Sequence, residues 1–411
     1  MTAIAYEYPD DLKTILEAVR GFLRAEVFPR HEKHEKLLTN HRTLYGEDGR
    51  FTHEAWELIS EVRMAAASAG FYGMCAPAEI GGGGFGLVAY FAVWEEIFRL
   101  CGMKHWLGHH MLSHWAKGPS PVLKEMTEEA KRTILPDIMS GKATLCFGLS
   151  EPGAGSDAAM IKTRAEPDGD GWRLNGGKIW TTNSPHADYV VVFAITDPEK
   201  AAKRAGGIST FLVPTNAKGF VIEKVIKMWG SPGGDEAVLH FDDLRLEPMH
   251  LVGKLHKGFA TALLGVNLGR IYNSARVVGI GRWALEMAFD YAKIRNTFGK
   301  PIAEYQGVTF PLAESAMQIH AAHLMSLNVA QLLDRGLPAV KELSMTKAFA
   351  VEAGVKCIDR VIQTHGAIGM TNEMYLTDAF ITMRKINVAD GSNEILRRQI
   401  VRQMLGGDTA L

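Results

Sequence analysis

The spacing of apolar residues changes its period twice along this chain, and this change constrains the fold more than any other feature. From residue 10 to about 140, apolar residues recur three and four apart, as in Leu12, Leu16 and Val19, which indicates amphipathic helices. Near residue 143 the pattern changes to short β-branched or aromatic runs, such as YVVVFAI and STFLVP, separated by turn residues. After about residue 254 the helical period returns. This order excludes the alternating strands and helices of a doubly wound sheet.

We therefore predict an α+β protein, mostly α, with three domains. The predicted parts are an N-terminal α-helical domain at 1–140, a middle β-barrel domain at 141–253 and a C-terminal helical bundle at 254–411. In the last part, one predicted helix face runs through Ile271, Ala275, Val278, Leu285, Phe289 and Ala292. A second face runs through Met345, Ala348, Val355, Ile358 and Ile362.

Charge and cysteine content limit the partners of the chain. Lys and Arg number 45 against 46 Asp and Glu, and the formal net charge is −1, so no basic field favours nucleic acid. Four scattered cysteines without a CxxC pair suggest reduced thiols rather than a disulfide framework. The first residues lack the pattern of a signal peptide, and no apolar run is long enough to span a bilayer. We expect a cytoplasmic protein without a membrane partner.

Glycine and histidine patterns suggest a dinucleotide site and a metal site, and for both we favour a simpler interpretation. Residues 81–86 (GGGGFG) and 153–158 (GAGSDA) match dinucleotide-binding patterns, but neither lies in a predicted βαβ unit, which favours a plain turn. Four histidines have i, i+4 spacings on what we expect to be one helix: His105, His109, His110 and His114. This spacing suits zinc, yet no HExxH motif accompanies it, so we expect no metal.

Two segments of the predicted β domain carry residues suited to a flat ligand. LSEPGAGSD, residues 149–157, runs from a strand end into a loop of small residues whose amides could face an anion or a ring edge. GGKIWTTN then places Trp180 and Thr182 on or beside a neighbouring strand. A planar aromatic next to hydroxyls suits a heterocycle; the alternative is that Trp180 packs in the core and Thr182 only fills a strand.

Taken together, these segments resemble the acyl-CoA dehydrogenase family. The matching runs appear in order: CFGLSEPGAGSD, NGGKIWTTN, NLGRIYN, RNTFGKP with Gln306, QTHGAIG and ADGSNEILRRQ. The resemblance implies a helical domain, a β-barrel and a four-helix bundle around FAD. It also implies an oxidoreductase of lipid catabolism that passes electrons to an electron-transfer flavoprotein, and a homotetramer built as a dimer of dimers.

The resemblance assigns site residues by matching positions. It implies that Phe147, Leu149 and Ser150 line the flavin ring, and that Trp180 and Thr182 pack near its N5 atom. Contacts to the FAD of a neighbouring subunit are implied for Arg295, Thr297, Phe298 and Gln306. Further cofactor contacts are implied for Gln363, Gly366, Gly369, Ser392 and Glu394, and substrate contacts for Ser156, Asn267 and Gly391. Independently, the guanidinium of Arg295 suits a pyrophosphate, the alternative being an exposed cation at a helix end.

The catalytic base of the family matches Asp390 in this chain. Most members carry a glutamate in a closing Glu-Gly-(Thr/Ser) motif, and here the run is Ala-Asp-Gly-Ser at 389–392. The other known position of the base is Gly269, beside Arg270, and carries no carboxylate. We expect Asp390 to act as base with a pKa raised by burial, and Arg270 to support it. The alternative is that Asp390 only caps a helix.

The aspartate leaves alternative reactions open. Ala-Asp-Gly with Gly-Arg is similar to a branch associated with 4-hydroxyacyl-CoA and 4-phosphoacyl-CoA substrates. Relatives of the same fold include flavin oxidases and monooxygenases. A non-catalytic, DNA-associated relative is a third alternative, against which the near-zero net charge argues.

Overall fold

The structure is a computed structural model that describes residues 6–410. These residues pack into two compact units that are interleaved along the chain. The helical unit contains 6–33, 86–109 and 270–410, and the sheet unit contains 34–85 and 110–269. The predicted fold class, with helices before and after a central sheet region, is confirmed, whereas the predicted boundaries at 140 and 253 stay a prediction.

The helical unit begins with the stripe read from the sequence. Helix α1 (Asp10–Phe22) continues through a π-helical segment (Leu23–Val27) into α2 (Phe28–Lys33). Leu12, Leu16, Val19 and Leu23 are buried along one side, so the predicted amphipathic face is confirmed. Helix α6 (Leu87–Cys101) follows in this unit and is apolar on nearly all sides, which fits a helix surrounded by others.

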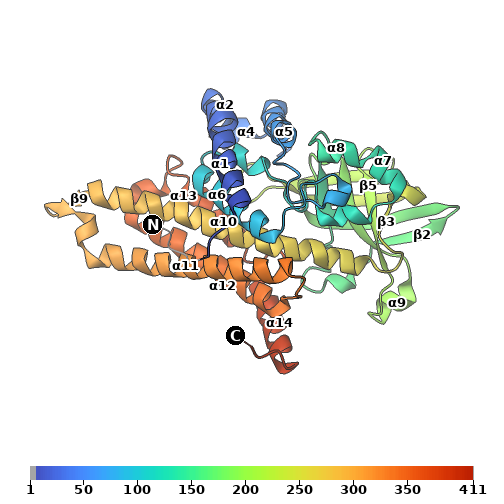
Figure 1. Cartoon of the computed structure of the whole chain (residues 1–411). Helices are drawn as coiled ribbons and strands as arrows, with labels where there is room; N and C mark the ends of the chain where they lie inside the picture. Colours follow the sequence, from blue (N-terminus) through green and yellow to red (C-terminus); the bar gives the residue numbers. More distant parts are fainter. Residues whose placement is uncertain (1–5, 411) are drawn as a thin grey trace. The chain divides into compact units, whose positions relative to one another are not determined.

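Long helices form the rest of the helical unit. They are α10 (Gly258–Ile294), which begins in the sheet unit, α11 (Gln306–Asp334), α12 (Val340–His365), α13 (Leu376–Lys385) and α14 (Asn393–Leu405). Figure 1 shows α10, α11 and α12 running side by side. A Cβ atom on Gly279 of α10 would lie 2.5 Å from the Glu95 carbonyl oxygen of α6, so glycine lets these two helices approach closely.

The buried face of α12 differs from the predicted one. Met345, Val355 and Ile362 are only partly buried, whereas Lys347 and Val351 are buried. The predicted face is displaced because Lys347 lies inside the protein, where its ammonium group donates to main-chain oxygens. A hydropathy pattern assigns a lysine to the surface.

In the sheet unit, α5 (His53–Ser68), α7 (Glu128–Thr133) and α8 (Leu135–Met139) accompany one sheet. Within residues 6–410 the sheet has eight strands in the order β6-β7-β3-β2-β4-β5-β8, with β1 parallel to β4. The strands are β1 (Leu145–Gly148), β2 (Arg164–Asp168), β3 (Gly171–Thr182), β4 (Tyr189–Ile195), β5 (Ile208–Pro214), β6 (Phe220–Ile226), β7 (Glu236–Leu246) and β8 (Leu251–Val252).

Both faces of the central strands are buried. On β4, Val190 and Val192 join one apolar core, while Val191 and Phe193 join another that includes residues of α7 and α8. Because β5 and β7 both contribute to the first core, the sheet curves around it. Burial on two sides explains why β4 reads as a continuous apolar run rather than an alternating one.

Among the described residues, no helix is both long enough and apolar enough to cross a membrane.

Candidate active site

Asp390 lies in the loop between α13 and α14, in an uncommon backbone conformation. Asp390 has φ 52° and Gly391 has φ 91°, so two consecutive residues occupy the left-handed region. The N-cap of α14 is Ser392, whose hydroxyl oxygen accepts a hydrogen bond from the amide of Ile395 at 3.5 Å. The capping alternative for Asp390 is therefore wrong, because Ser392 caps this helix.

The Asp390 carboxylate points to α10 instead. The side-chain amide of Asn273 donates to Oδ2 of Asp390 at 2.7 Å. Nε of Arg270, one turn earlier on the same helix, donates to the main-chain carbonyl of Asp390 at 3.1 Å. The structure therefore brings the two predicted catalytic residues together and adds Asn273, which the sequence reading did not single out.

Burial raises the pKa of the Asp390 carboxyl from 3.8 to about 6. Lys347, Arg270 and Arg276 act in the opposite direction through their positive charges, as does the hydrogen bond from Asn273. A carboxylate with this pKa is mostly ionised at pH 7 and is a stronger base than an exposed aspartate. The direction agrees with the expectation from the sequence.

Lys347 of α12 anchors the same loop. Its ammonium group donates to the carbonyl oxygen of Gly391 at 2.9 Å and to Oδ1 of Asn393 at 3.2 Å, and it is fully buried. Burial lowers the pKa of Lys347 to about 8. The sequence reading missed this residue, although a lysine inside an apolar helix face is a usable signal.

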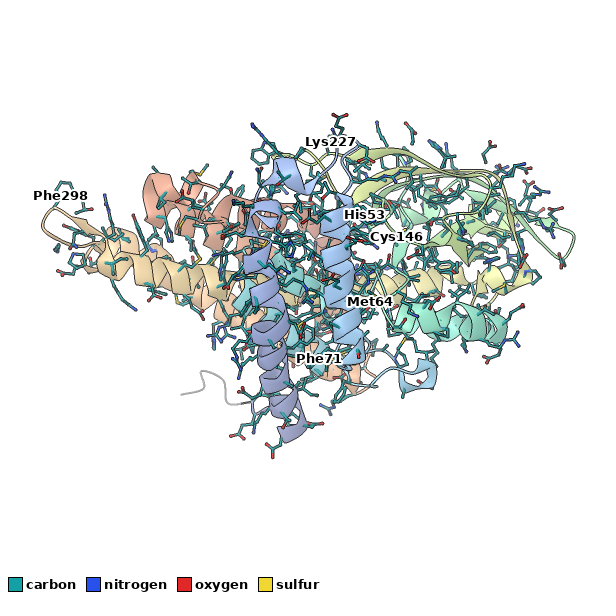
Figure 2. The ribbon with its side chains drawn as sticks, turned by 90° about the horizontal axis from the view of Figure 1, so that it is seen from above. His53, Met64, Phe71, Cys146, Lys227 and Phe298 are labelled. Atoms are coloured by element: carbon teal, nitrogen blue, oxygen red, sulfur yellow. The ribbon has the colours of Figure 1, made fainter. Side chains whose placement is uncertain are left out.

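The hairpin that follows α10 carries a second group of predicted residues. Its strands are β9 (Asn296–Thr297) and β10 (Lys300–Pro301), joined through Phe298 at φ 51°. Phe298 is 93% exposed, and Figure 2 shows its ring at the tip of the hairpin, directed away from the ribbon. Arg295 and Gln306, at the two ends of the hairpin, are also exposed.

The hairpin group lies near the predicted glycine loop but not near Asp390. The ring of Tyr291, at the end of α10, stacks on that of His365 at 4.6 Å, directly before Gly366. Gln363 and Gly366 are exposed there, whereas Gly369 is buried. By contrast, α10 runs about 30 Å from Asn273 to its end at 1.5 Å per residue. The hairpin residues therefore cannot contact a ligand atom held at Asp390 of the same subunit.

Three other predicted residues have simple surroundings. Glu394 is exposed in the first turn of α14, and Ser156 is exposed in the loop after β1. Asn267 is partly buried on α10, in the sheet unit.

In the sheet unit, the segment after β1 is held against β3 by one main-chain hydrogen bond and one from a lysine side chain. The carbonyl oxygen of Ser150 accepts from the amide of Ile179 at 3.0 Å, and that of Leu149 accepts from Nζ of Lys178 at 3.2 Å. Phe147 packs its ring against Trp115 and Phe193, with centroids 4.8 and 4.9 Å away. These contacts bring Phe147, Leu149 and Ser150 next to β3.

Trp180 sits in a bulge of β3. The register with β7 shifts between Lys178 and Thr181, and Trp180 has φ 61°. A bulge redirects side chains, and here it leaves the Trp180 side chain 55% exposed. The alternative of a core tryptophan is therefore wrong. Thr182, two residues on, is partly buried with its hydroxyl 3.5 Å from Oε1 of Glu236.

A buried ion pair fixes the loop between these elements. Glu151 accepts hydrogen bonds from Nζ of Lys178 at 2.8 Å and from the amides of Lys162 and Thr163 at 2.6 and 3.0 Å. Burial lowers the pKa of Lys178 to about 8, and the nearby ammonium and amide groups hold the pKa of Glu151 below its usual value. Both groups are therefore charged at pH 7. Sequence reasoning did not find this pair.

The four histidines do not lie on one α-helix, contrary to our expectation. Residues Trp106–His110 form a short 3-10 helix that ends before His114. His109 bonds the carbonyl oxygen of Gly102 at 2.9 Å, and Nδ1 of His114 accepts from the amide of Ala116 at 3.1 Å. Within residues 6–410 no group of three or more candidate metal ligands occurs. The turn reading of 81–86 is confirmed, since these glycines follow a 3-10 turn rather than a strand.

Comparison with known proteins gives a consistent result. Three family models match the chain in order: acyl-CoA dehydrogenase N-terminal domain at 9–142, middle domain at 146–244 and C-terminal domain at 256–405. The probable acyl-CoA dehydrogenase YngJ of Bacillus subtilis is 33% identical over 400 residues, covering 97% of this chain and 99% of the relative.

Two solved structures are similar over nearly the whole chain. The crystal structure of acyl-CoA dehydrogenase from Geobacillus kaustophilus has a TM-score of 0.82 at 26% identity, covering 98% of this chain and 100% of that one. A structure described as the electron transferring flavoprotein of Acidaminococcus fermentans has a TM-score of 0.82 at 27% identity, with the same coverage.

Proposed function

Since the chain belongs to the acyl-CoA dehydrogenase family, a family of oxidoreductases, we propose that it oxidises an acyl-CoA thioester to the 2-enoyl-CoA with Asp390 as the base. The observation that carries the proposal is the Asp390 carboxylate, held by Asn273 and given a pKa of about 6 by burial. A base of this strength, ionised at neutral pH, suits removal of a proton activated by a thioester carbonyl.

The proposed reaction removes one proton and one hydride. The Cα–H bond breaks and its proton moves to Asp390. The Cβ–H bond breaks and this hydrogen leaves as a hydride, with the electron pair of that bond. The electron pair left on Cα forms the double bond between the two carbons. FAD, when bound, supplies the hydride acceptor. Arg270 holds the main chain of the base, and Ser156, Asn267 and Gly391 are proposed substrate contacts.

The residues of each unit suit a flavin. In the sheet unit, the half-exposed Trp180 offers an aromatic face, and Gly153 and Gly155 leave open space along the loop after β1. We assign the ring to Phe147, Leu149, Ser150, Trp180 and Thr182. The exposed Arg295 offers a permanent cation for a pyrophosphate. The remaining proposed contacts are Thr297, Phe298, Gln306, Gln363, Gly366, Gly369, Ser392 and Glu394.

The proposal includes a homotetramer in which the hairpin of one subunit serves the FAD of another. The exposed Phe298 and its distance from Asp390 support this, because the hairpin residues have no access to their own base. Exposed apolar residues on α11 at seven-residue spacing, Phe310, Met317 and Leu324, suit packing against a second copy. We further propose an electron-transfer flavoprotein as acceptor.

Arg276 favours a second candidate substrate class, acyl groups with a polar or anionic substituent such as 4-hydroxy- or 4-phosphoacyl-CoA. Its guanidinium lies over the rings of Tyr272 and Phe98, 4.5 and 5.6 Å from their centroids, and its charge acts on Asp390. Arg276 is one turn after Asn273 on α10. A plain hydrocarbon chain offers no partner to a cation in this position, whereas an anionic substituent on the acyl group would be attracted to it.

Flavin reduction tests the proposal directly. The FAD-loaded protein is mixed anaerobically with straight-chain, 4-hydroxy, 4-phospho and aryl acyl-CoA thioesters, and bleaching of the flavin absorbance is followed. We expect lasting bleaching with at least one thioester, and loss of at least about 10³-fold in rate in Asp390→Asn with FAD still bound. Asp359→Asn, an exposed carboxylate on α12, is the matched control.

The outcomes separate the rival reactions. Bleaching in the absence of O₂, without rapid reoxidation when O₂ is admitted, supports a dehydrogenase, whereas rapid O₂ consumption identifies an oxidase. Full activity in Asp390→Asn would refute the assignment of the base.

A further inference from the structure

Asn273 is a buried amide on α10, one turn after Arg270 and one turn before Arg276. Asn273 is only 3% exposed, and its neighbours Ile271, Tyr272 and Ala275 are also buried. A buried amide requires hydrogen-bond partners, and the Asn273 amide finds one in Oδ2 of Asp390 at 2.7 Å. The short distance is typical of a bond to a charged acceptor.

Among the described residues, Arg270 and Lys347 donate to main-chain oxygens of the base loop, and Asn273 donates to the Asp390 carboxylate. Nε of Arg270 and Nζ of Lys347 donate to the carbonyl oxygens of Asp390 and Gly391, at 3.1 and 2.9 Å. These bonds fix a backbone that occupies the left-handed region at two consecutive residues. They leave the terminal torsion of the aspartate side chain undetermined, because that torsion is broad and soft. The bond from Asn273 determines it.

We propose that Asn273 is a positioning residue for the base: its amide fixes the orientation of the Asp390 carboxylate and favours the ionised form. The inference rests on the proposed function of Asp390. It explains how an aspartate, one methylene shorter than glutamate, can be held in a single orientation toward the substrate. Nothing in the sequence motif around Asp390 carries this role, because Asn273 is 117 residues away.

Charged groups from three helices also act on this site. Arg270 and Arg276 come from α10, Lys347 and Glu352 from α12, and Glu394 from α14. Asn273 differs from all of them because it is neutral. It therefore acts on the carboxylate through a hydrogen bond rather than through net charge.

The test replaces Asn273 with leucine, which has nearly the same shape and no donor. Removal of the donor disfavours the carboxylate, so we expect the pKa of Asp390 to rise by about one to two pH units. With a starting pKa of about 6, this predicts a loss in the rate of flavin reduction of about 5- to 50-fold at pH 6 and only about 1- to 2-fold at pH 8. A merely structural role would give a loss independent of pH.

Two further variants keep the test decisive. Ser274→Ala removes a buried hydroxyl that bonds the carbonyl oxygen of Arg270 on the same helix, and it should leave the pH midpoint unchanged. Asn273→Asp places a second carboxylate beside Asp390, so one proton should be shared between them and the pH midpoint should rise further than in the leucine variant. This variant preserves the shape of the site if leucine impairs folding.

Infrared difference spectra give a readout that does not depend on turnover. The protonated carboxyl band of Asp390, identified by its absence in Asp390→Asn, is followed against pH in the wild type and in both Asn273 variants. A raised midpoint in the variants supports the inference even if no acyl-CoA reduces the flavin, in which case only the proposed function fails. An unchanged midpoint in Asn273→Leu and Asn273→Asp, with reduction by acyl-CoA intact, would overturn the inference.

Discussion

Replacement of Asp390 by asparagine should make the protein more stable at neutral and alkaline pH while it abolishes the proposed activity. The carboxylate is ionised in a buried position, which costs free energy, and asparagine removes that charge at almost constant shape. Its side-chain oxygen can still accept the hydrogen bond from Asn273. Asparagine also tolerates the left-handed backbone at residue 390 better than most residues do.

The magnitude follows from the pKa of Asp390 in the two states. The pKa is about 6 in the folded protein against 3.8 for an ordinary aspartate, a difference of about 2 pH units. At about 1.4 kcal/mol per unit, ionisation destabilises the folded state by about 3 kcal/mol above pH 6. Below pH 3.8 both states are protonated and the difference disappears. The destabilisation therefore grows as pH rises from about 4 to about 6 and is constant above.

Thermal unfolding of the wild type and Asp390→Asn at a series of pH values measures this effect. For a chain of 411 residues, 3 kcal/mol corresponds to a rise in Tm of about 3 °C. We expect this rise at pH 8 and no rise at pH 3.5. Asp359→Asn, exposed on α12, should show neither. A Tm difference that does not vary with pH, or a lower Tm at pH 8, would show that Asp390 does not pay a burial cost in the folded state.

Three other substitutions test the sites in both units. Lys178→Met should lower the free energy of unfolding by about 3–5 kcal/mol, because Glu151 is left buried without its cation. Lys203 is exposed, so Lys203→Met should leave stability unchanged; thermal unfolding of both variants measures the difference. Trp180→Ala should weaken FAD binding about tenfold with little change in Tm, and Trp229→Ala, which removes a tryptophan that is 77% exposed, should leave FAD affinity unchanged in a fluorescence titration. Gly391→Ala should lower the free energy of unfolding by about 1–2 kcal/mol, because Gly391 has φ 91°, and it should slow flavin reduction at least about tenfold. Gly336 has φ 76° and open space around it, so Gly336→Ala should lower the free energy of unfolding by a similar amount and leave the rate of flavin reduction unchanged. Equal rates in the two glycine variants would contradict the placement of the base loop.

The sequence identified candidate residues by their type and motif, but it did not predict their surroundings. The run Ala-Asp-Gly-Ser identified Asp390 as the candidate base, and the structure shows that Ser392, not Asp390, caps the following helix. The period of apolar residues predicted the helices, but on α12 it misjudged the buried face, because Lys347 lies inside with its charge on main-chain oxygens. Equal spacing also misled the reading of His105 and His109, since i, i+4 spacing places rings together only where the chain is helical.

What the sequence determined by itself are the properties that depend on neighbouring residues: the order of helical and strand regions, the turn chemistry, and the residue types of the motifs that identify the family. The tertiary structure decided everything that requires distant segments to meet. The bond from Asn273 to Asp390 joins two helical regions 117 residues apart, and the exposure of Trp180 depends on the register of β3 against β7. The pKa of Asp390 belongs to the same class, because desolvation is a property of the atoms that surround a group in space and not of those beside it in the chain.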